Sequence, residues 1–534
     1  MKKLLILFLI ICLASCSNNR SGDITILSTN DVHGTYFPQS FVDTIYKYPS
    51  LCQVSETVKE YRDSLGDNHV LLFDIGDGYQ GTNASYYANF VDSTSSKHLF
   101  SRIVNYMKYD VLVVGNHDIE AGHPVYDRIS KEIDASYLAC NAISREKKRS
   151  YFEPYTIIRK NNMKIAVIGA TSPAIASWVS PDKWEGMVFI PIKECVEMYV
   201  KEVKKKEHPD FIIVAIHAGV GQGDALNIEQ CGEFLAKNLQ GIDVIMASHD
   251  HIPYINKIYN GQDSVLLIDG GCKSKYISKI NLNLKDSASI ITKNVSGCLL
   301  HTDIHKLDKD YLNTFRPDYN KIKKFSNAEI GFLNQDLDFS KALNSSCDYM
   351  KFIHFIQMKY SDSELSIAAP LNTKGFIHKG KLVYNDLFRL YRFENSLESI
   401  NMTGKEVKDY LENSYDYQLK EKGFYFNYDS MAGLNYTVDK SKENGHRINI
   451  ISMADGGNFN STKLYKVAIN SYRVNGGGGL LSSVGLNRKI LNNRIIKNYP
   501  EIRNCIYNYI KENKTINIEE IENNYHIGSW KFVD

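Results

Sequence analysis

The stretch "DVLVVGNHDIE", residues 110–120, joins an apolar, β-branched run to a cluster of polar side chains. Short runs of this kind are typical of buried strands. Parallel α/β sheets place their ligands at the carboxyl ends of such strands. A polar turn would give the same local pattern. The stretch alone therefore does not distinguish a functional site from a polar turn, and the distinction depends on the rest of the chain.

Similar apolar runs recur before residue 271 and predict a layered α/β domain. They are bounded by turn residues and read DITILSTND, HVLLFDIGD, KIAVIGATS, DFIIVAIHAG, DVIMASHDH and SVLLIDGG. Helical stretches lie between several of them, such as CVEMYVKEVKKK, which is apolar on one face. The alternation predicts an α/β domain over about residues 23–305.

The remaining chain predicts a connector and a second domain. A length of 534 residues favours two domains. Residues 306–345 are charged and partly helical, and we expect them to form the connector. Residues 346–534 mix helical stretches with strands such as GLNYTVD and KLYKVAINSY, which predicts an α+β domain.

The N-terminus predicts export. Lys2 and Lys3 precede the apolar run LLILFLIICLAS and then Cys16, a pattern typical of a secretory signal. "LASC" also resembles a bacterial lipobox, in which the cysteine is lipidated. We therefore expect residues 1–22 to be a lipoprotein signal and tether, with the protein anchored through Cys16 and facing the periplasm or cell surface. An ordinary signal peptide that contains Cys16 is the alternative.

Charge and cysteine content exclude some classes of partner and site. The chain has 63 basic and 61 acidic residues, a net charge of +2, which does not favour a nucleic-acid polymer as partner. Eight of the ten cysteines remain once Cys12 and Cys16 are set aside, and they contain no C-x-x-C pair. A thiolate metal site is therefore not expected. We expect the protein to be a monomer.

Five predicted strands end in oxygen or imidazole donors. The donors are Asp31 and His33, then Asp77, then Asn116 and His117, then His217, and last His249 and His251. Such a set suits two borderline divalent ions that share a carboxylate. Two ions about 3.5 to 4 Å apart can activate a water and stabilise an in-line phosphoryl displacement. A single histidine at a strand end is more often structural, but joint occurrence at consecutive strand ends favours a metal site.

This ordered set resembles the calcineurin-like metallophosphoesterases, and in particular the secreted 5′-nucleotidase superfamily. The resemblance implies a four-layer αββα domain followed by an α+β substrate-binding domain. It implies that one divalent ion (zinc, manganese, iron or cobalt) is held by Asp31, His33, Asp77 and His251. A second ion would be held by Asp77, Asn116, His217 and His249, with Asp77 bridging. His117 matches the family's catalytic histidine, which stabilises the transition state and protonates the leaving oxygen.

The chain departs from the family pattern at several positions. Glu120 stands where the family has a shorter Asp or Asn, and we expect it to orient His117. Ser248 replaces the usual glycine before the H-x-H motif. The arginines that 5′-nucleotidases place around the phosphate are not evident, and Arg389 and Arg392 are either substitutes or helix surface.

The second domain carries a glycine run, "NSYRVNGGGGLL". Gly476 and Gly477 would let the backbone approach a ligand. Tyr472 would then cover a flat base, with Tyr428 as its partner. In the resembling superfamily two aromatic residues at these positions enclose the nucleobase. The alternative is that both tyrosines are core residues with satisfied hydroxyl groups.

Details of this domain favour one branch of the superfamily. Gly478 replaces an acidic residue that binds ribose hydroxyls in 5′-nucleotidases. The segments around Asn395 and Trp178 resemble the 2′,3′-cyclic-nucleotide 2′-phosphodiesterase/3′-nucleotidases, and Asn395 matches a motif residue expected to contact substrate. We expect metal-dependent hydrolysis of nucleotide phosphate esters of this kind. The alternatives are a 5′-nucleotidase or nucleotide-sugar hydrolase and, less favoured, a non-catalytic nucleotide-binding surface lipoprotein.

Overall fold

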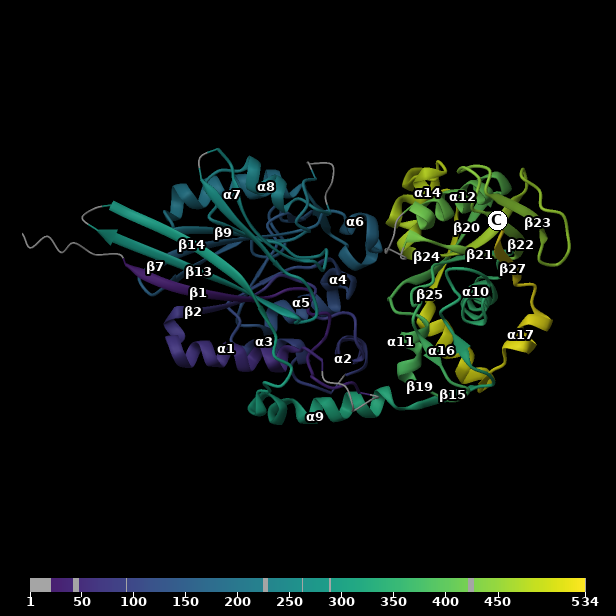
Figure 1. Cartoon of the computed structure of the whole chain (residues 1–534), viewed down its shortest axis with the longest axis horizontal. Coiled ribbons are helices and arrows are strands. Elements are labelled where there is room, and N and C mark those ends of the chain that lie inside the picture. The colour runs from purple at the N-terminus through teal and green to yellow at the C-terminus, as the bar shows by residue number, and fades with distance from the viewer. Residues whose placement is uncertain are drawn as a thin grey trace, which may run out of the picture.

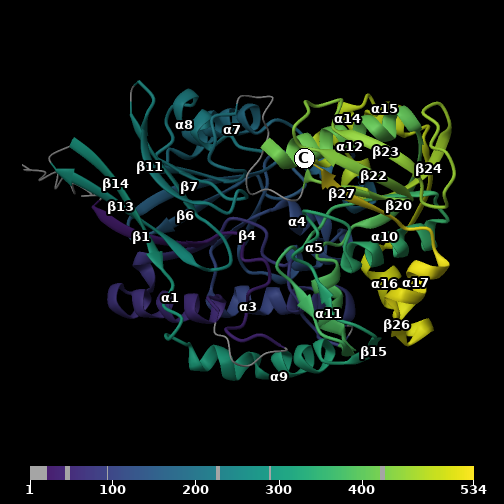
Figure 2. The same ribbon diagram turned by 45° about the vertical axis from the view of Figure 1, so that its right-hand side comes forward.

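The computed structural model describes residues 21–41, 48–92, 94–223, 229–261, 263–287, 290–420 and 427–533. It consists of two lobes side by side, with helix α9 (Lys309–Ser326) running beneath the first lobe towards the second (Figures 1 and 2). The predicted signal lies outside the described residues, apart from its last two positions. Within the described part of the chain, no helix combines the length and the apolar character needed to cross a bilayer.

The first lobe contains two six-stranded sheets. The first sheet has the strand order β14-β13-β1-β2-β3-β4. Its members are β1 (Gly22–Thr29), β2 (Val70–Asp74), β3 (Val111–Val113), β4 (Ser136–Leu138), β13 (Tyr276–Ser287) and β14 (Ile290–His301). Strands β1 to β4 are parallel to one another, and β13 and β14 extend the sheet in an antiparallel hairpin.

The second sheet has the order β11-β12-β10-β9-β7-β6. It is built from β6 (Tyr155–Lys160), β7 (Met163–Thr171), β9 (Phe211–His217), β10 (Val244–Met246), β11 (Pro253–Tyr259) and β12 (Ser264–Gly270). The four inner strands are parallel, and the two edge strands are antiparallel to them. Both sheets therefore present a row of carboxyl ends.

Helices cover the outer face of each sheet, so the strands are buried on both faces and read as continuous apolar runs. One core lies between the sheets and includes Ile26, Phe73, Ile213 and Met246. The first sheet is covered by α1 (Leu51–Leu65), α3 (Leu99–Met107) and α5 (His123–Glu132), and the second by α7 (Ile192–Glu207) and α8 (Gly232–Asn238) (Figure 1). The result is the four-layer αββα arrangement that the family resemblance implied.

Residues 306–345, which were expected to form a connector, do not form a separate segment between the lobes. Helix α9 packs on the first lobe, where Tyr311 and Phe315 are buried in its outer core and Asp318 forms an ion pair with Arg102. Strand β15 (Glu329–Leu333) instead pairs with β19 (Gly380–Val383) and β26 (Thr515–Ile516) of the second lobe. Apolar side chains along both elements drive them onto opposite lobes, and the second lobe begins well before residue 346.

The second lobe is an α+β domain. Its main sheet has the order β21-β17-β24-β20-β25, formed by β17 (Leu365–Ala368), β20 (Ser396–Thr403), β21 (Ser430–Ala432), β24 (Leu464–Asn470) and β25 (Ile495–Glu501). A smaller sheet joins β22 (Leu434–Asp439), β23 (Ile448–Met453) and β27 (Gly528–Val533). The main helices are α10 (Asp348–Ser361), α11 (Tyr384–Leu390), α12 (Gly404–Lys420) and α16 (Ile502–Asn513). Helix α13 (Ser471–Val474) follows β24 and leads into the glycine run.

Candidate active site

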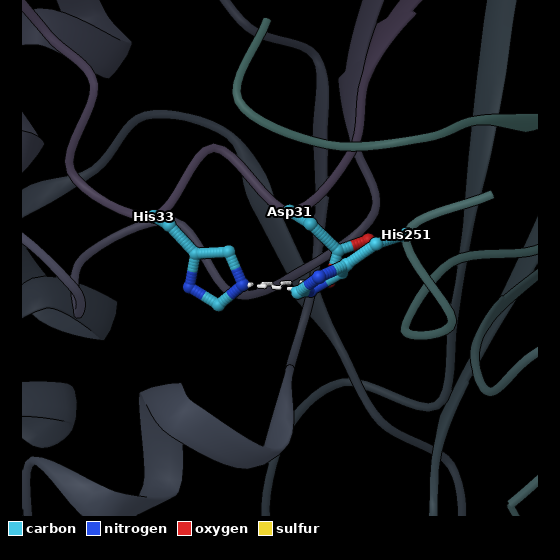
Figure 3. Close-up of side chains that lie close together, drawn as sticks. All are labelled: Asp31, His33 and His251. Atoms are coloured by element: carbon cyan, nitrogen blue, oxygen red, sulfur yellow. Dashed lines mark hydrogen bonds and ion pairs between the residues drawn. The ribbon is translucent and has the colours of Figure 1, made fainter. Parts of the chain in front are cut away.

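The predicted metal ligands gather at the carboxyl edge of the two sheets in the first lobe. Asp31, His33 and His251 form one group and Asp77, His217 and His249 a second, and within each group the ligand atoms lie within 4.8 Å of one another. In the first group the Nε2 atoms of His33 and His251 face each other at 3.0 Å (Figure 3). Three of these ligands follow or end strands of one sheet and the others come from its partner, so the site requires both sheets.

Asn116 completes the second group. Its Oδ1 lies 3.0 Å from Nε2 of His217 and 3.0 Å from Nδ1 of His249. Nε2 of His217 also lies 3.2 Å from Oδ2 of Asp77. The two groups adjoin, because the same His217 atom is 4.0 Å from Oδ1 of Asp31 in the first group.

The donor set fits divalent cations. Oδ1 of Asp31 is buried without a hydrogen-bond partner among the described residues, and three imidazole nitrogens surround it: those of His251 at 3.5 Å, His33 at 4.0 Å and His217 at 4.0 Å. A cation is the group that would satisfy all four atoms together.

Contacts behind the ligands orient them. Nδ1 of His33 lies 3.3 Å from the carbonyl oxygen of Gln80, and Nδ1 of His217 lies 2.8 Å from that of Ile75. Each contact leaves Nε2 of the same ring free to bind a metal. Ser248, where the family has glycine, donates its hydroxyl to Oδ2 of Asp31. The serine therefore leaves Oδ1 as the oxygen of Asp31 that points into the site.

Protonation of the histidines follows from burial and from the acidic side chains. Burial lowers the pKa of His33 to about 3 and that of His249 to about 4, so both rings are neutral, which is the form that binds metal. His217 differs. Although burial lowers its pKa, the charges of Asp77 and Asp31 raise it to about 10. Binding of a cation there would release a proton.

The ligand loops adopt unusual backbone conformations. Five of the seven predicted ligands have positive φ values, namely Asp31, His33, Asp77, His249 and His251. Such conformations are costly and concentrate at functional sites. Asp118 stabilises this arrangement, because its carboxylate accepts hydrogen bonds from the backbone N–H groups of Asp77 and Gly78, both at 3.0 Å, and of Gly115 at 2.8 Å. A Cβ at Gly115 would lie 2.1 Å from Oδ1 of Asp77, so glycine is required there.

His117 and Glu120 meet beside the second group, on helix α4 (Asn116–Glu120). Nδ1 of His117 lies 2.5 Å from Oε2 of Glu120, so the longer glutamate side chain reaches the ring. The His117 backbone N–H donates to Oδ1 of Asp77 at 2.8 Å. Although burial lowers it, the charges of Asp77 and Glu120 raise the pKa of His117 to about 9. The imidazole therefore holds a proton at neutral pH.

A cavity of about 330 Å³ opens between the lobes above these residues. Seven of the predicted metal and catalytic residues, Glu120 among them, line its floor, while Asp31 and His217 lie wholly buried beneath it. The second lobe contributes polar and aromatic walls, which include Arg392, Phe393, Asn395, Asn470, Tyr472 and Arg473. The candidate metal ligands and these walls therefore come from different lobes.

The structure does not place Tyr428 in this cavity. Its side chain is fully buried, its ring packs 5.1 Å from that of Tyr415, and its hydroxyl donates to Tyr415 at 3.1 Å. Tyr428 is thus a core residue with a satisfied hydroxyl group, which was the alternative interpretation. Phe393 supplies the aromatic wall instead, with its ring parallel to that of His117 at 6.4 Å between centroids.

The other predicted substrate residues divide into two kinds. Tyr472 and Asn395 line the cavity, whereas Gly476 and Gly477 do not. A Cβ at Gly477 would lie 2.4 Å from ring atoms of Tyr472. The glycine run therefore accommodates the Tyr472 ring, and Gly476 and Gly477 lie outside the residues that line the cavity.

Sequence reasoning missed two aromatic walls. Trp178, at the end of helix α6 (Ile175–Trp178), stacks on the ring of His249 with centroids 5.2 Å apart and planes 13° apart. Phe393 lies two residues before Asn395. Both residues belong to the segments whose resemblance to the cyclic phosphodiesterases was noted from the sequence. That resemblance was the sequence signal that could have identified them.

Comparisons with known proteins also divide the chain into two parts. Residues 24–253 match the model of the calcineurin-like phosphoesterases, and residues 326–483 match that of the 5′-nucleotidase C-terminal domain. The trifunctional nucleotide phosphoesterase protein YfkN of Bacillus subtilis is 24% identical over 579 residues, which cover 95% of this chain. The chain spans only 39% of the length of that relative.

Two further matches extend over nearly the whole chain. The 2′,3′-cyclic-nucleotide 2′-phosphodiesterase/3′-nucleotidase of Salmonella typhimurium is 22% identical over 543 residues, covering 87% of this chain and 83% of its own length. A Staphylococcus aureus protein solved in complex with alpha-ketoglutarate has a TM-score of 0.80 at 20% identity, covering 96% of this chain and 99% of its own. At that identity the structural likeness concerns the fold alone.

Proposed function

The chain joins a calcineurin-like phosphoesterase domain to a 5′-nucleotidase C-terminal domain, and from that premise we propose that it hydrolyses phosphate esters of nucleotides in a metal-dependent reaction. The favoured activity is that of a 2′,3′-cyclic-nucleotide 2′-phosphodiesterase and 3′-nucleotidase. One observation carries the proposal: metal-competent donors and aromatic walls, contributed by separate lobes, line one cavity. That combination suits a substrate with a phosphate at one end and a flat base at the other.

The proposed division of labour follows from the positions of the residues. Asp31, His33, Asp77 and His251 would hold one divalent ion, and Asp77, Asn116, His217 and His249 a second. Two ions at such a site supply Lewis acidity, a water of lowered pKa and charge stabilisation for an in-line displacement at phosphorus. Tyr472 and Phe393 would enclose the base, which sets the distance between the base and the reacting phosphate.

His117 and Glu120 would act on the leaving group. The protonated imidazole lies beside Asp77 at the cavity floor, where it can donate a proton to the leaving oxygen of the ester. Glu120 contacts the opposite ring nitrogen, fixes the tautomer and stabilises the positive charge on the ring before transfer. The metal ligands, by contrast, would hold the ions on the side from which water attacks the phosphorus.

The glycine at position 478 supports the favoured branch. Its φ is +70°, and a Cβ there would lie 2.2 Å from Oδ1 of Asn427 and 2.4 Å from Nη1 of Arg473. Arg473 is itself held by Asp429, with Nε 2.7 Å from the carboxylate. An acidic side chain for ribose hydroxyls would therefore require these groups to move. A substrate whose ribose hydroxyls are esterified with phosphate would not need an acidic side chain that binds free hydroxyls.

We also propose export and lipid anchoring at Cys16, on the strength of the N-terminal sequence. Labelling of the expressed protein with a clickable palmitate analogue is expected to be lost in Cys16→Ser. Retention of the label in that variant would contradict the lipobox assignment.

Turnover of a substrate panel tests the proposed activity. We expect the purified signal-less protein to release phosphate from 3′-AMP and to open 2′,3′-cyclic AMP in the presence of manganese or zinc, and to lose both activities with a chelator. Phosphate release and chromatography of the nucleosides measure this. Turnover of 5′-AMP alone would favour the 5′-nucleotidase alternative, and nucleotide binding without turnover would favour a binding lipoprotein.

The role of Tyr472 makes a separate prediction. Stacking of a base on an aromatic ring contributes about 1 to 3 kcal/mol, so Tyr472→Ala should raise KM for nucleotides about tenfold. KM for p-nitrophenyl phosphate should change little, because that ester has no base. Tyr259→Ala, on a side chain that is 68% exposed on strand β11, is the matched control. Equal effects on both substrates would argue against stacking.

A further inference from the structure

A buried carboxylate, that of Glu394, links the two lobes beside the cavity. Its Oε2 accepts a hydrogen bond at 2.6 Å from the side chain of Gln80 in the first lobe, and its Oε1 accepts one at 2.9 Å from Nη1 of Arg503 in its own lobe. The Glu394 side chain is only 8% exposed, and that of Arg503 is fully buried. Hydrogen bonds to a charged group are stronger than those between neutral groups, and exclusion of water strengthens them further. The carboxylate is therefore held firmly between the lobes.

Arg503 also holds the chain segment that forms the aromatic wall of the cavity. We call residues 391–395 the wall segment, because it carries Phe393. Nε of Arg503 donates to the carbonyl oxygen of Tyr391 at 3.1 Å, and Nη2 donates to that of Arg392 at 2.7 Å. The donors of a guanidinium have a fixed planar arrangement. One buried side chain therefore fixes the backbone of the wall segment at two consecutive residues, together with the carboxylate that follows.

Gln80 joins the wall segment to the metal-binding floor. Its backbone carbonyl oxygen lies 3.3 Å from Nδ1 of His33, and its side chain donates to Glu394. A Cβ at Gly81 would lie 3.1 Å from Cβ of His33, so the chain packs closely against the ligand at this point. Gln80 therefore contacts a candidate metal ligand through its backbone and the wall segment through its side chain.

A second hydrogen bond crosses the lobe interface away from the cavity. Nδ2 of Asn83 in the first lobe donates to Oδ1 of Asn385 in helix α11 at 2.8 Å. Neither of these two described residues belongs to the cavity lining. This contact joins the lobes without touching the wall segment or a candidate metal ligand, so it offers a direct comparison with the Gln80 contact.

We propose that Glu394 is a positioning residue for the reaction, which fixes the distance between the base-binding wall and the metal-binding floor through its bonds to Arg503 and Gln80. Glu394 lies outside the cavity lining, so it acts through the wall segment. Displacement of a bound substrate by about 1 Å can lower the rate about 10²-fold. The inference rests on the proposed function, in which the wall binds the base and the floor meets the phosphate.

Gln80→Leu tests the role of the link, because it removes the contact between the lobes and leaves the pair of Glu394 with Arg503 in place. For the metal-loaded variant we expect kcat for 3′-AMP to fall about tenfold with little change in KM, since the base still binds but the phosphate is displaced. The values for p-nitrophenyl phosphate should change little, because that ester has no base. Asn385→Ala is the matched control and should leave both substrates at wild-type values.

A double-mutant cycle joins Gln80 to Glu394. Glu394→Gln should give the same selective loss of kcat for 3′-AMP, and the double variant should lose no more than the larger of the two single losses, because both changes break one link. A rise in KM with unchanged kcat in Gln80→Leu would mean that the side chain contacts substrate itself. Equal losses on both esters would mean that the metal-binding floor is disturbed. Either result would overturn the proposal.

Hydrogen exchange tests the link without turnover. Peptides that cover the wall segment are expected to exchange about tenfold faster in Gln80→Leu than in the wild type, the effect of losing one charge-assisted hydrogen bond. Asn385→Ala should leave their exchange unchanged. Unchanged exchange in Gln80→Leu would refute the link even if the protein hydrolyses nucleotides. Faster exchange in that variant, with no turnover of nucleotides by the wild type, would support the link and refute the proposed function.

Discussion

Asp77→Asn is expected to lower kcat/KM for nucleotide hydrolysis on the order of 10³-fold or more, which corresponds to about 4 kcal/mol of transition-state stabilisation. One oxygen of Asp77 lies 3.2 Å from Nε2 of His217, and the other accepts the His117 backbone N–H at 2.8 Å. The amide removes the negative charge that two cations would share. It also weakens the link between the metal site and the helix that carries His117.

Metal content and turnover together check this expectation. Metal per chain is measured by mass spectrometry of the purified protein, and we expect it to fall from two towards one or none in Asp77→Asn. Asp67→Asn is the control, because that side chain is 65% exposed and pairs with Lys108 at the surface. If Asp77→Asn retained two ions and wild-type turnover, the assignment of Asp77 as the shared ligand would be wrong.

His117→Gln should lower kcat about 10²- to 10⁴-fold with little change in metal content. The side chain belongs to neither group of candidate ligands, yet it lines the cavity and its partner Glu120 holds the ring. A residue that protonates the leaving oxygen matters most when that oxygen is a poor leaving group. The loss should therefore be much larger for 3′-AMP than for p-nitrophenyl phosphate, whose phenolate departs without help.

The leaving-group dependence distinguishes proton donation from a structural role. His123→Ala provides the comparison, since His123 contacts Asp127 at 3.1 Å and the Glu185 carbonyl at 2.9 Å and lies outside the cavity. It should leave both substrates at near wild-type rates. An equal loss on the two esters in His117→Gln would mean that the ring positions the phosphate or the loops and does not protonate the leaving group.

The clustering of the candidate metal ligands was predictable because its information is local. Each ligand lies within a few residues of a strand's carboxyl end, and strand, turn and donor can all be recognised in one short stretch such as residues 110–120. Parallel sheets then bring these ends to one edge whatever the details of packing. The reach of Glu120 to His117 is of the same kind, since the two residues are one helical turn apart.

The substrate wall was predicted less well because it depends on which side of a chain segment faces the core. Tyr428 and Tyr472 are both flanked by polar residues, but one ring packs into the core beside Tyr415 and the other lines the cavity. The hydrophobic effect does not distinguish two tyrosines until their neighbours are in place. Phe393 lines the cavity in place of Tyr428 for the same reason, because the side chains packed around each ring decide where it points.

The sequence by itself was enough to predict the α/β order of the first domain and, through the family resemblance, seven candidate metal ligands and the pairing of His117 with Glu120. Only the tertiary structure decided the split of the connector between the lobes and the contact of Ser248 with Asp31. These features join residues that are more than a hundred positions apart in the chain or depend on the packing of one lobe against another. Such contacts are set by the sum of many weak packing and electrostatic terms, and no short motif encodes them.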